Sequence, residues 1–220
     1  MTSTPAPAPT RHEPRWPAAV ALLAVGGLRL AIPESLSFGP DWLLLAIVVL
    51  LMIPTGWARY RGNPALSRNL GILLNSVVTA DMVYSLILLV IAMPQHREAP
   101  RALLQSAAAL WIVNILVFAS WYWRLDAGGP HARDLRGSHT DGAFLFPQMT
   151  LNPETRSAMG EEDWSPHFVD YLFLAFNTST AFSPTDSPVL TRWAKVLMML
   201  QSFISFTTVA LLAARAVNIL

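Results

Sequence analysis

The sequence contains no cysteine and few charged residues. None of its 220 residues is Cys, and Asp, Glu, Lys and Arg together make up 13% of the chain. The lack of cysteine excludes disulfides, thiolate catalysis and cysteine metal sites. The histidines include no i, i+4 pair, so we expect neither a helical metal site nor a bound cofactor. No phosphate-binding loop and no nucleophile–base–acid pattern is present, and we therefore expect that the protein is not an enzyme.

Apolar residues are abundant, by contrast. They make up 53% of the chain, and the mean hydropathy is +0.42. Several separate apolar runs are each long enough to cross a hydrocarbon core of ~30 Å. The sequence therefore predicts an all-α, polytopic transmembrane helix bundle in contact with the lipid bilayer. The net charge of +1 gives no reason to expect nucleic acid as a partner.

Four regions follow one another along the chain. Residues 1–15 are rich in Pro, Ala and Thr and are predicted to be a disordered tail. Residues 16–123 are predicted to hold four transmembrane helices. Residues 124–167 form a hydrophilic segment that is long for a loop in a compact protein. Residues 168–220 are predicted to hold a short pore-like helix, a polar turn and a final transmembrane helix. The four expected helices of the second region cover 16–32, 41–57, 69–93 and 102–123.

The arginines give the expected orientation. Arg11 and Arg15 precede the first helix, and a basic loop over 58–68 follows two crossings later. The positive-inside rule places both on the cytoplasmic side. The helix predicted over 168–182 is short for a crossing. If it crosses, the chain has six spans; we predict that it enters and leaves on one side, which gives five.

The stretch FNTSTAFSPTD, residues 176–186, places hydroxyl and amide side chains between two apolar segments. Ser187 and Pro188 then suit the cap and first turn of the final helix. Non-helical backbone at membrane depth must be buried in protein or line a wet cavity. Two interpretations follow: the hydroxyls satisfy a structural turn, or they line a solute or ion site. The candidate residues are Asn177, Thr178, Ser179, Thr180, Ser183 and Asp186.

Two further polar positions lie inside predicted spans. Gln201 shares one face of the last helix with Ser205 and Thr208, and this face either packs against another helix or lines a cavity. Asp81 lies near the middle of the third helix, where a carboxylate costs ~2.5–3.5 kcal/mol on insertion scales. Arg29 is its candidate partner. Asp81 therefore has either a structural ion pair or a role with a proton or ion.

Two segments with aromatic residues give further predictions. The apolar island FLFPQM, residues 144–149, is expected to pack with Trp164 on the bundle, over the polar turn. The residues 121–123, Trp-Tyr-Trp, stand at a predicted helix end, which is typical of an aromatic belt at the membrane surface.

The order of short helix, hydroxyl-rich turn, Asp186 and long helix resembles the pore module of the two-helix potassium channels. In that family a filter with the sequence Thr-Val-Gly-Tyr-Gly-Asp lies between a pore helix and an inner helix. This chain has no Gly after Gly160, although the carbonyl filter requires glycine backbone angles. The resemblance therefore implies the architecture of a pore loop without its potassium chemistry.

The chain also resembles a group of uncharacterised bacterial integral membrane proteins that are distantly channel-like. The segments NILVFASWYWRLDAGGP, FLFPQM, DYLFLAFNTSTAFSPTD and RWAKVLMMLQSFISFTTVALLAARAVNIL, within residues 100–220, support this similarity. It implies a multi-pass protein of the bacterial cytoplasmic (inner) membrane.

The expected function is a degenerate, channel-like module that conducts or senses a small monovalent ion. Potassium channels build one pore from several two-helix modules, so the resemblance implies a homo-oligomer. The alternative is a non-conducting membrane scaffold or partner-binding subunit, in which the polar turn is structural and residues 124–166 form the recognition surface.

Overall fold

The computed structural model is an all-α helix bundle, which confirms the predicted fold class. It describes residues 13–92, 99–136, 139, 141–161, 164–183 and 187–217. Of the predicted N-terminal tail, residues 1–12 lie outside this part of the chain, whereas Glu13 is buried. The helices are α1 (Trp16–Leu28), α2 (Leu43–Tyr60), α3 (Pro64–Ala92), α4 (Pro100–Leu125), α5 (Pro130–Asp134), α6 (Pro147–Thr150), α7 (Pro153–Ala158), α8 (Phe168–Ala181) and α9 (Arg192–Val217), with 3-10 turns η1 (Arg29–Ala31), η2 (Glu34–Leu36) and η4 (Asp126–Gly128).

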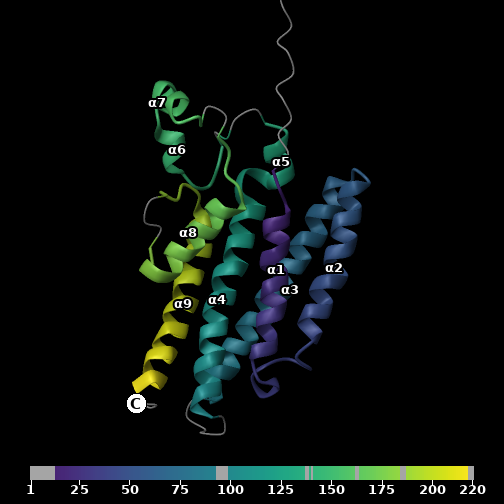
Figure 1. Ribbon diagram of the computed structural model, residues 1–220, viewed down its shortest axis with the longest axis vertical. Helices are drawn as coiled ribbons and strands as arrows, with labels where there is room; N and C mark the ends of the chain where they lie inside the picture. Colours follow the sequence, from purple (N-terminus) through teal and green to yellow (C-terminus); the bar gives the residue numbers. More distant parts are fainter. Residues whose placement is uncertain are drawn as a thin grey trace, which may run out of the picture.

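Helix α4 is the centre of the bundle. It packs against α1, α3, α8 and α9, while α2 packs on the outer side against α1 and α3 (Figure 1). Helices α2, α3, α4 and α9 are each long and apolar enough to cross a membrane, as expected of a multi-pass membrane protein. The apolar stretch of α1 with η1, Trp16–Ala31, is shorter.

The connection between α2 and α3 is tighter than the predicted basic loop over 58–68. Gly62 ends α2 with a φ of 68°, and the side chain of Asn63 accepts a hydrogen bond of 3.0 Å from the Leu66 amide. Pro64 then occupies the first turn of α3, where its missing amide proton costs nothing. Because these residues allow α2 and α3 to extend into the predicted loop, Arg59 lies in the last turn of α2 and Arg68 near the start of α3.

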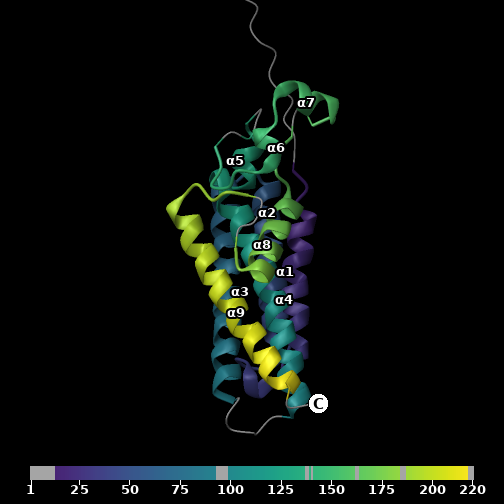
Figure 2. The ribbon, with the colours of Figure 1, turned by 90° about the vertical axis from the view of Figure 1, so that its left-hand side faces the viewer.

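Helix α8 enters the bundle beside the C-terminal end of α4 and reaches about halfway along it (Figure 2). At the entrance, the rings of Phe168 and Trp123 have centroids 5.9 Å apart. At the other end of α8, the ring of Phe176 lies 6.4 Å from that of Trp111, near the middle of α4. Since α8 has only 14 residues, it dips into the bundle without crossing it.

The segment after α8 returns to the same end of the bundle. There residues 143–145 and 188–190 run side by side as an antiparallel pair. Leu145 donates a backbone hydrogen bond of 2.9 Å to Pro188, and Leu190 donates one of 2.8 Å to Ala143. This pairing holds Pro188 in extended backbone, so α9 begins at Arg192. The prediction that Ser187 and Pro188 open the last helix is therefore wrong.

The polar turn also begins later than expected. Residues 177–180 belong to α8, which ends at Phe182 in the left-handed conformation with a φ of 54°. The hydroxyls of Thr178 and Thr180 donate to carbonyls one turn back on α8, so these polar side chains are satisfied without ending the helix.

The segment between α4 and α8 covers one end of the bundle. Phe144 and Phe146 are buried against Tyr171, near the start of α8 and not over its tip as expected. The aromatic-belt prediction is wrong, because Tyr122 and Trp123 are buried inside the bundle. The aromatic side chains that are exposed near helix ends include those of Trp16, Trp42, Trp57 and Tyr60.

Candidate functional site

The candidate residues on α8 divide between two faces of the helix. Thr178 and Ser179 are fully buried against the bundle, whereas Thr180 and Ser183 are exposed and Asn177 is half-buried. Asp186, the remaining candidate, lies outside the described residues. The row of hydroxyls is therefore split between the inside of the bundle and its surface.

Gln201 on α9 is the centre of the buried polar contacts. Its Nε2 donates hydrogen bonds of 2.7 Å to the Ala175 carbonyl and 2.9 Å to the Ser179 hydroxyl. Its Oε1 accepts one from the Tyr122 hydroxyl. Three helices thus meet at this amide, and each of its polar atoms has a partner within the chain.

Ser205 and Asn114 extend this cluster toward the tip of α8. Ser205 donates a hydrogen bond of 2.7 Å to the Ser179 carbonyl and accepts one of 3.1 Å from the Trp111 indole. Asn114 donates to Ser179 and to the Gln201 carbonyl at 3.4 and 3.3 Å. The Oδ1 atom of Asn114 is buried and has no hydrogen-bond partner in the described part of the chain.

The side chains in this cluster are uncharged, and most of their polar atoms have hydrogen-bond partners. Their contacts therefore stabilise the packing of α4, α8 and α9. A buried polar group without a partner costs ~1–3 kcal/mol, and here the groups of α4, α8 and α9 satisfy one another. The predicted face of Gln201, Ser205 and Thr208 therefore packs against α8 and α4. Among the α8 candidates in the described residues, Thr180 and Ser183 are the exposed hydroxyl residues.

Asp81 is paired with Arg29 at the far end of α1. Its Oδ2 lies 3.5 Å from the Arg29 Nε, and the Asp41 carboxylate lies 3.6 Å from another guanidinium nitrogen. Arg29 also donates to the Phe38 carbonyl at 3.3 Å and is 1% exposed. The arrangement agrees with the structural ion pair, the first of the two alternatives for Asp81.

A second buried carboxylate, Asp126, joins α8 to the covering segment. Its oxygens accept hydrogen bonds from the Tyr171 hydroxyl at 2.6 Å and the Ala143 amide, and His139 Nε2 lies 3.5 Å away. Asp126 was not among the candidate residues of the sequence analysis. The signal that could have found it is the Gly128–Gly129 turn, which folds the chain back over this carboxylate.

Glu13 and Arg133 form a buried ion pair, in which a terminal guanidinium nitrogen lies 2.9 Å from the Glu13 Oε2. Glu13 also accepts a hydrogen bond from the Trp123 indole, and Arg133 donates to the Trp123 and Asp126 carbonyls. Both residues lie in polar segments of the sequence that show no hydrophobic periodicity, so their burial could not be predicted from a periodic pattern.

No cluster of three or more His, Cys, Asp or Glu that could hold a metal ion occurs in the described residues. No protein-family model, curated protein or solved structure matches the chain.

Proposed function

We propose that the protein is a channel-like membrane protein that conducts or senses a small monovalent ion as a homo-oligomer in a bacterial cytoplasmic membrane. The observation that supports this most directly is the path of α8, which enters the bundle, ends halfway along α4 and returns to the same end. This is the arrangement implied by the resemblance to potassium-channel pore modules.

The distribution of polar groups favours a pathway between copies over one through a single chain. Ser179 and Gln201 have partners within the chain and leave no polar path between α4, α8 and α9. Thr180 and Ser183 at the tip of α8 are exposed. Large apolar side chains on the same surface, including Phe176 and Phe206, would pack between neighbouring copies or against lipid.

The second candidate is a non-conducting membrane scaffold or partner-binding subunit. The hydrogen bonds that Ser179 makes with Asn114 and Gln201 favour it, because they account for this buried hydroxyl without any solute. The polar segment with α6 and α7, which extends beyond one end of the bundle, would then be the recognition surface (Figure 1).

Flux measurements on purified protein in proteoliposomes separate the two candidates. We expect potassium or sodium flux, together with an oligomer by native mass spectrometry. Replacing both tip hydroxyls, Thr180→Ala with Ser183→Ala, should lower the flux and leave the thermal midpoint of unfolding nearly unchanged. Thr207→Ala is the matched control, since Thr207 is an exposed hydroxyl on α9 that bonds only within its own helix.

The absence of flux for any monovalent ion over a wide pH range, in protein that is folded and oligomeric, would rule out conduction and favour the scaffold. A strictly monomeric protein would contradict a pathway between copies.

A further inference from the structure

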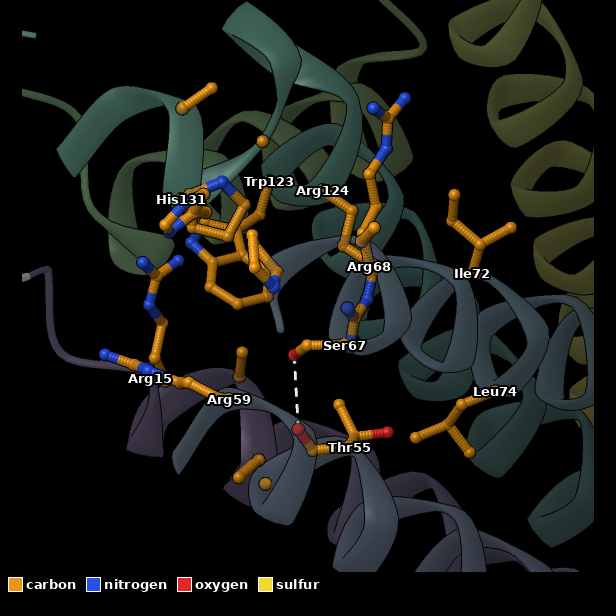
Figure 3. A pocket seen from close by; sticks show the side chains of 18 of the residues that line it. Arg15, Thr55, Arg59, Ser67, Arg68, Ile72, Leu74, Trp123, Arg124 and His131 are labelled. Atoms are coloured by element: carbon orange, nitrogen blue, oxygen red, sulfur yellow. Dashed lines mark hydrogen bonds between the residues drawn. The ribbon is translucent and has the colours of Figure 1, made fainter. Parts of the chain in front are cut away.

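A cavity of about 550 Å³ lies among α1, α2, α3 and the end of α4, away from α8 (Figure 3). Its walls come from the first turns of α1 and α3, the last turns of α2 and α4, and the start of α5. The volume falls within the ~300–1,000 Å³ range of small-molecule sites. Because two long helices begin and two end beside it, with the five-residue α5 as a further short start, their dipoles largely offset one another, and the side chains determine its charge.

The side chains at the mouth are cationic. Four arginines and a histidine line the cavity: Arg15, Arg59, Arg68, Arg124 and His131. Within the described residues, only Arg15 among these arginines has an ion-pair partner, the carboxylate of Asp134. Burial lowers the pKa of Arg15, and the nearby Arg59 lowers it further, against the opposing effect of Asp134 and Glu13. Gathering these cations is unfavourable unless an anion joins them.

Arg124 is held in place by its surroundings. Its Nε donates to Asn75 at 3.3 Å, and its guanidinium lies over the Trp123 ring, 5.4 Å from the centroid. A Cβ at Gly71 would lie 1.8 Å from one of its terminal nitrogens, so the glycine leaves the space that the guanidinium occupies. Such a fixed, planar donor suits the geometry of phosphate oxygens.

The inner wall of the cavity is apolar. Ala18 and Leu22 of α1 face Met52 of α2 and Ile72 and Leu74 of α3. Ala18, Leu22 and Leu74 are buried, and they close the cavity toward the middle of the bundle. A ligand that fills the whole space must therefore have a charged end at the mouth and an apolar end inside.

We infer that this cavity is a binding site for a phosphate-bearing amphiphile, with the phosphate between the arginines and the apolar part against α1 and α3. The site lies at the end of the bundle that the positive-inside rule assigns to the cytoplasm, where membranes expose anionic headgroups. It shares no lining residue with the α8 cluster, so it stands independently of conduction.

Native mass spectrometry of the full chain in detergent tests the site, with dioleoylphosphatidic acid as the probe and dioleoylphosphatidylcholine as the neutral comparison. We expect preferential binding of phosphatidic acid. The double variant Arg59→Gln with Arg68→Gln removes two exposed cations that have no described ion-pair partner, and it should bind at least about tenfold more weakly, as expected for losing a charge-assisted contact.

Arg61→Gln is the control for the loss of a nearby cation outside the cavity. Arg61 lies in the same loop and stacks 4.7 Å from the Trp57 ring centroid, but it does not line the cavity. It should keep wild-type binding. Equal binding of the two lipids, or equal loss of binding in the Arg61 variant and the double variant, would overturn the proposal.

Substitutions at two glycines distinguish binding inside the cavity from binding on the basic surface beside it. Gly56 lines the cavity and Gly27 does not, yet a Cβ at either position would meet no atom within 4 Å. Gly56→Leu should therefore weaken lipid binding, whereas Gly27→Leu should not. If Gly56→Leu binds like the wild type, the lipid lies on the surface and the inference fails.

Competition with inorganic phosphate distinguishes a binding site for an amphiphile from a binding site for a free anion. We expect that inorganic phosphate does not displace phosphatidic acid at equal phosphate concentration, because it gains nothing from the apolar wall. Full displacement under these conditions would show a site for soluble phosphate and would overturn the amphiphile.

Discussion

At the scale of single residues, Gln201 shows how a polar side chain can stabilise a helix that does not cross the bundle. Its amide binds a carbonyl and a hydroxyl of α8 and accepts from Tyr122 of α4. In a low-dielectric interior, losing such a residue costs more than its hydrogen bonds, because the former partners remain buried without replacements.

We therefore expect Gln201→Leu to lower the free energy of unfolding by about 2–3 kcal/mol, since it leaves the buried Tyr122 hydroxyl without its acceptor and removes the hydrogen bonds to α8. Thermal or denaturant unfolding in detergent measures this. Gln105→Leu on the exposed side of α4 is the control and should change stability by less than about 0.5 kcal/mol. Equal effects of the two substitutions would refute the role assigned to Gln201.

Arg29 and Asp81 allow a second test at this scale. Asp81→Asn should destabilise the protein by about 2 kcal/mol, less than a fully buried pair would, because Asp81 is partly exposed and Asp41 remains near Arg29. Asp41→Asn, at a more exposed carboxylate, should cost under about 1 kcal/mol. In the flux assay Asp81→Asn should leave the rate per folded protein unchanged. A lost flux with unchanged stability would show instead that Asp81 acts on an ion or proton.

At the scale of elements, the corner between α4 and α5 depends on its glycines. Gly129 has a φ of 91°, and a Cβ there would lie 2.7 Å from the Arg124 carbonyl oxygen. Gly160 also has a positive φ, of 71°, but a Cβ there would meet no atom within 4 Å. Gly129 combines a close approach with backbone angles, φ 91° and ψ 174°, that are confined almost entirely to glycine, whereas at Gly160 the steric overlap is absent.

Gly129→Ala should therefore lower the free energy of unfolding by about 2–3 kcal/mol, and Gly160→Ala by about 1 kcal/mol. The thermal midpoint of each variant measures this difference. If both variants unfold at the same temperature, the close approach to Arg124 does not constrain the corner.

The elements also show what the sequence could predict. Long apolar runs identified the spanning helices because hydropathy is a local property. The start of α9 could not be predicted, since Ser187 and Pro188 match a helix cap equally well. Their pairing with residues 143–145 decides the outcome, and that contact joins positions more than forty residues apart. The sequence shows the charges of Arg59, Arg68 and Arg124, but their positions around one cavity depend on the fold.

At the scale of the whole molecule, the arginines of the cavity and the covering segment lie at one end. The first turn of α1, the α2–α3 connection and α5 all lie at the end where α4 finishes, and η2 lies at the opposite end (Figure 1). The positive-inside rule then predicts that the end with α5–α7 faces the cytoplasm.

Because the chain has no native cysteine, single cysteines report on this orientation directly. Glu34→Cys in η2 and Glu154→Cys in α7 replace the same exposed residue type at opposite ends. A membrane-impermeant maleimide should label Glu34→Cys in intact spheroplasts and Glu154→Cys only after permeabilisation. The reverse pattern would invert the orientation and place the arginine cavity on the outer side.

The position of Gln201 in the chain has a consequence for biosynthesis. The hydrogen bonds that hold α8 in the bundle come largely from α9, which is made after it. During translation α8 therefore emerges after α4, its larger packing partner, but before the α9 side chains that donate most of its interhelical hydrogen bonds. Completion of α9 is thus the step that locks α8 into the membrane, and chains arrested before α9 should expose α8 to proteases.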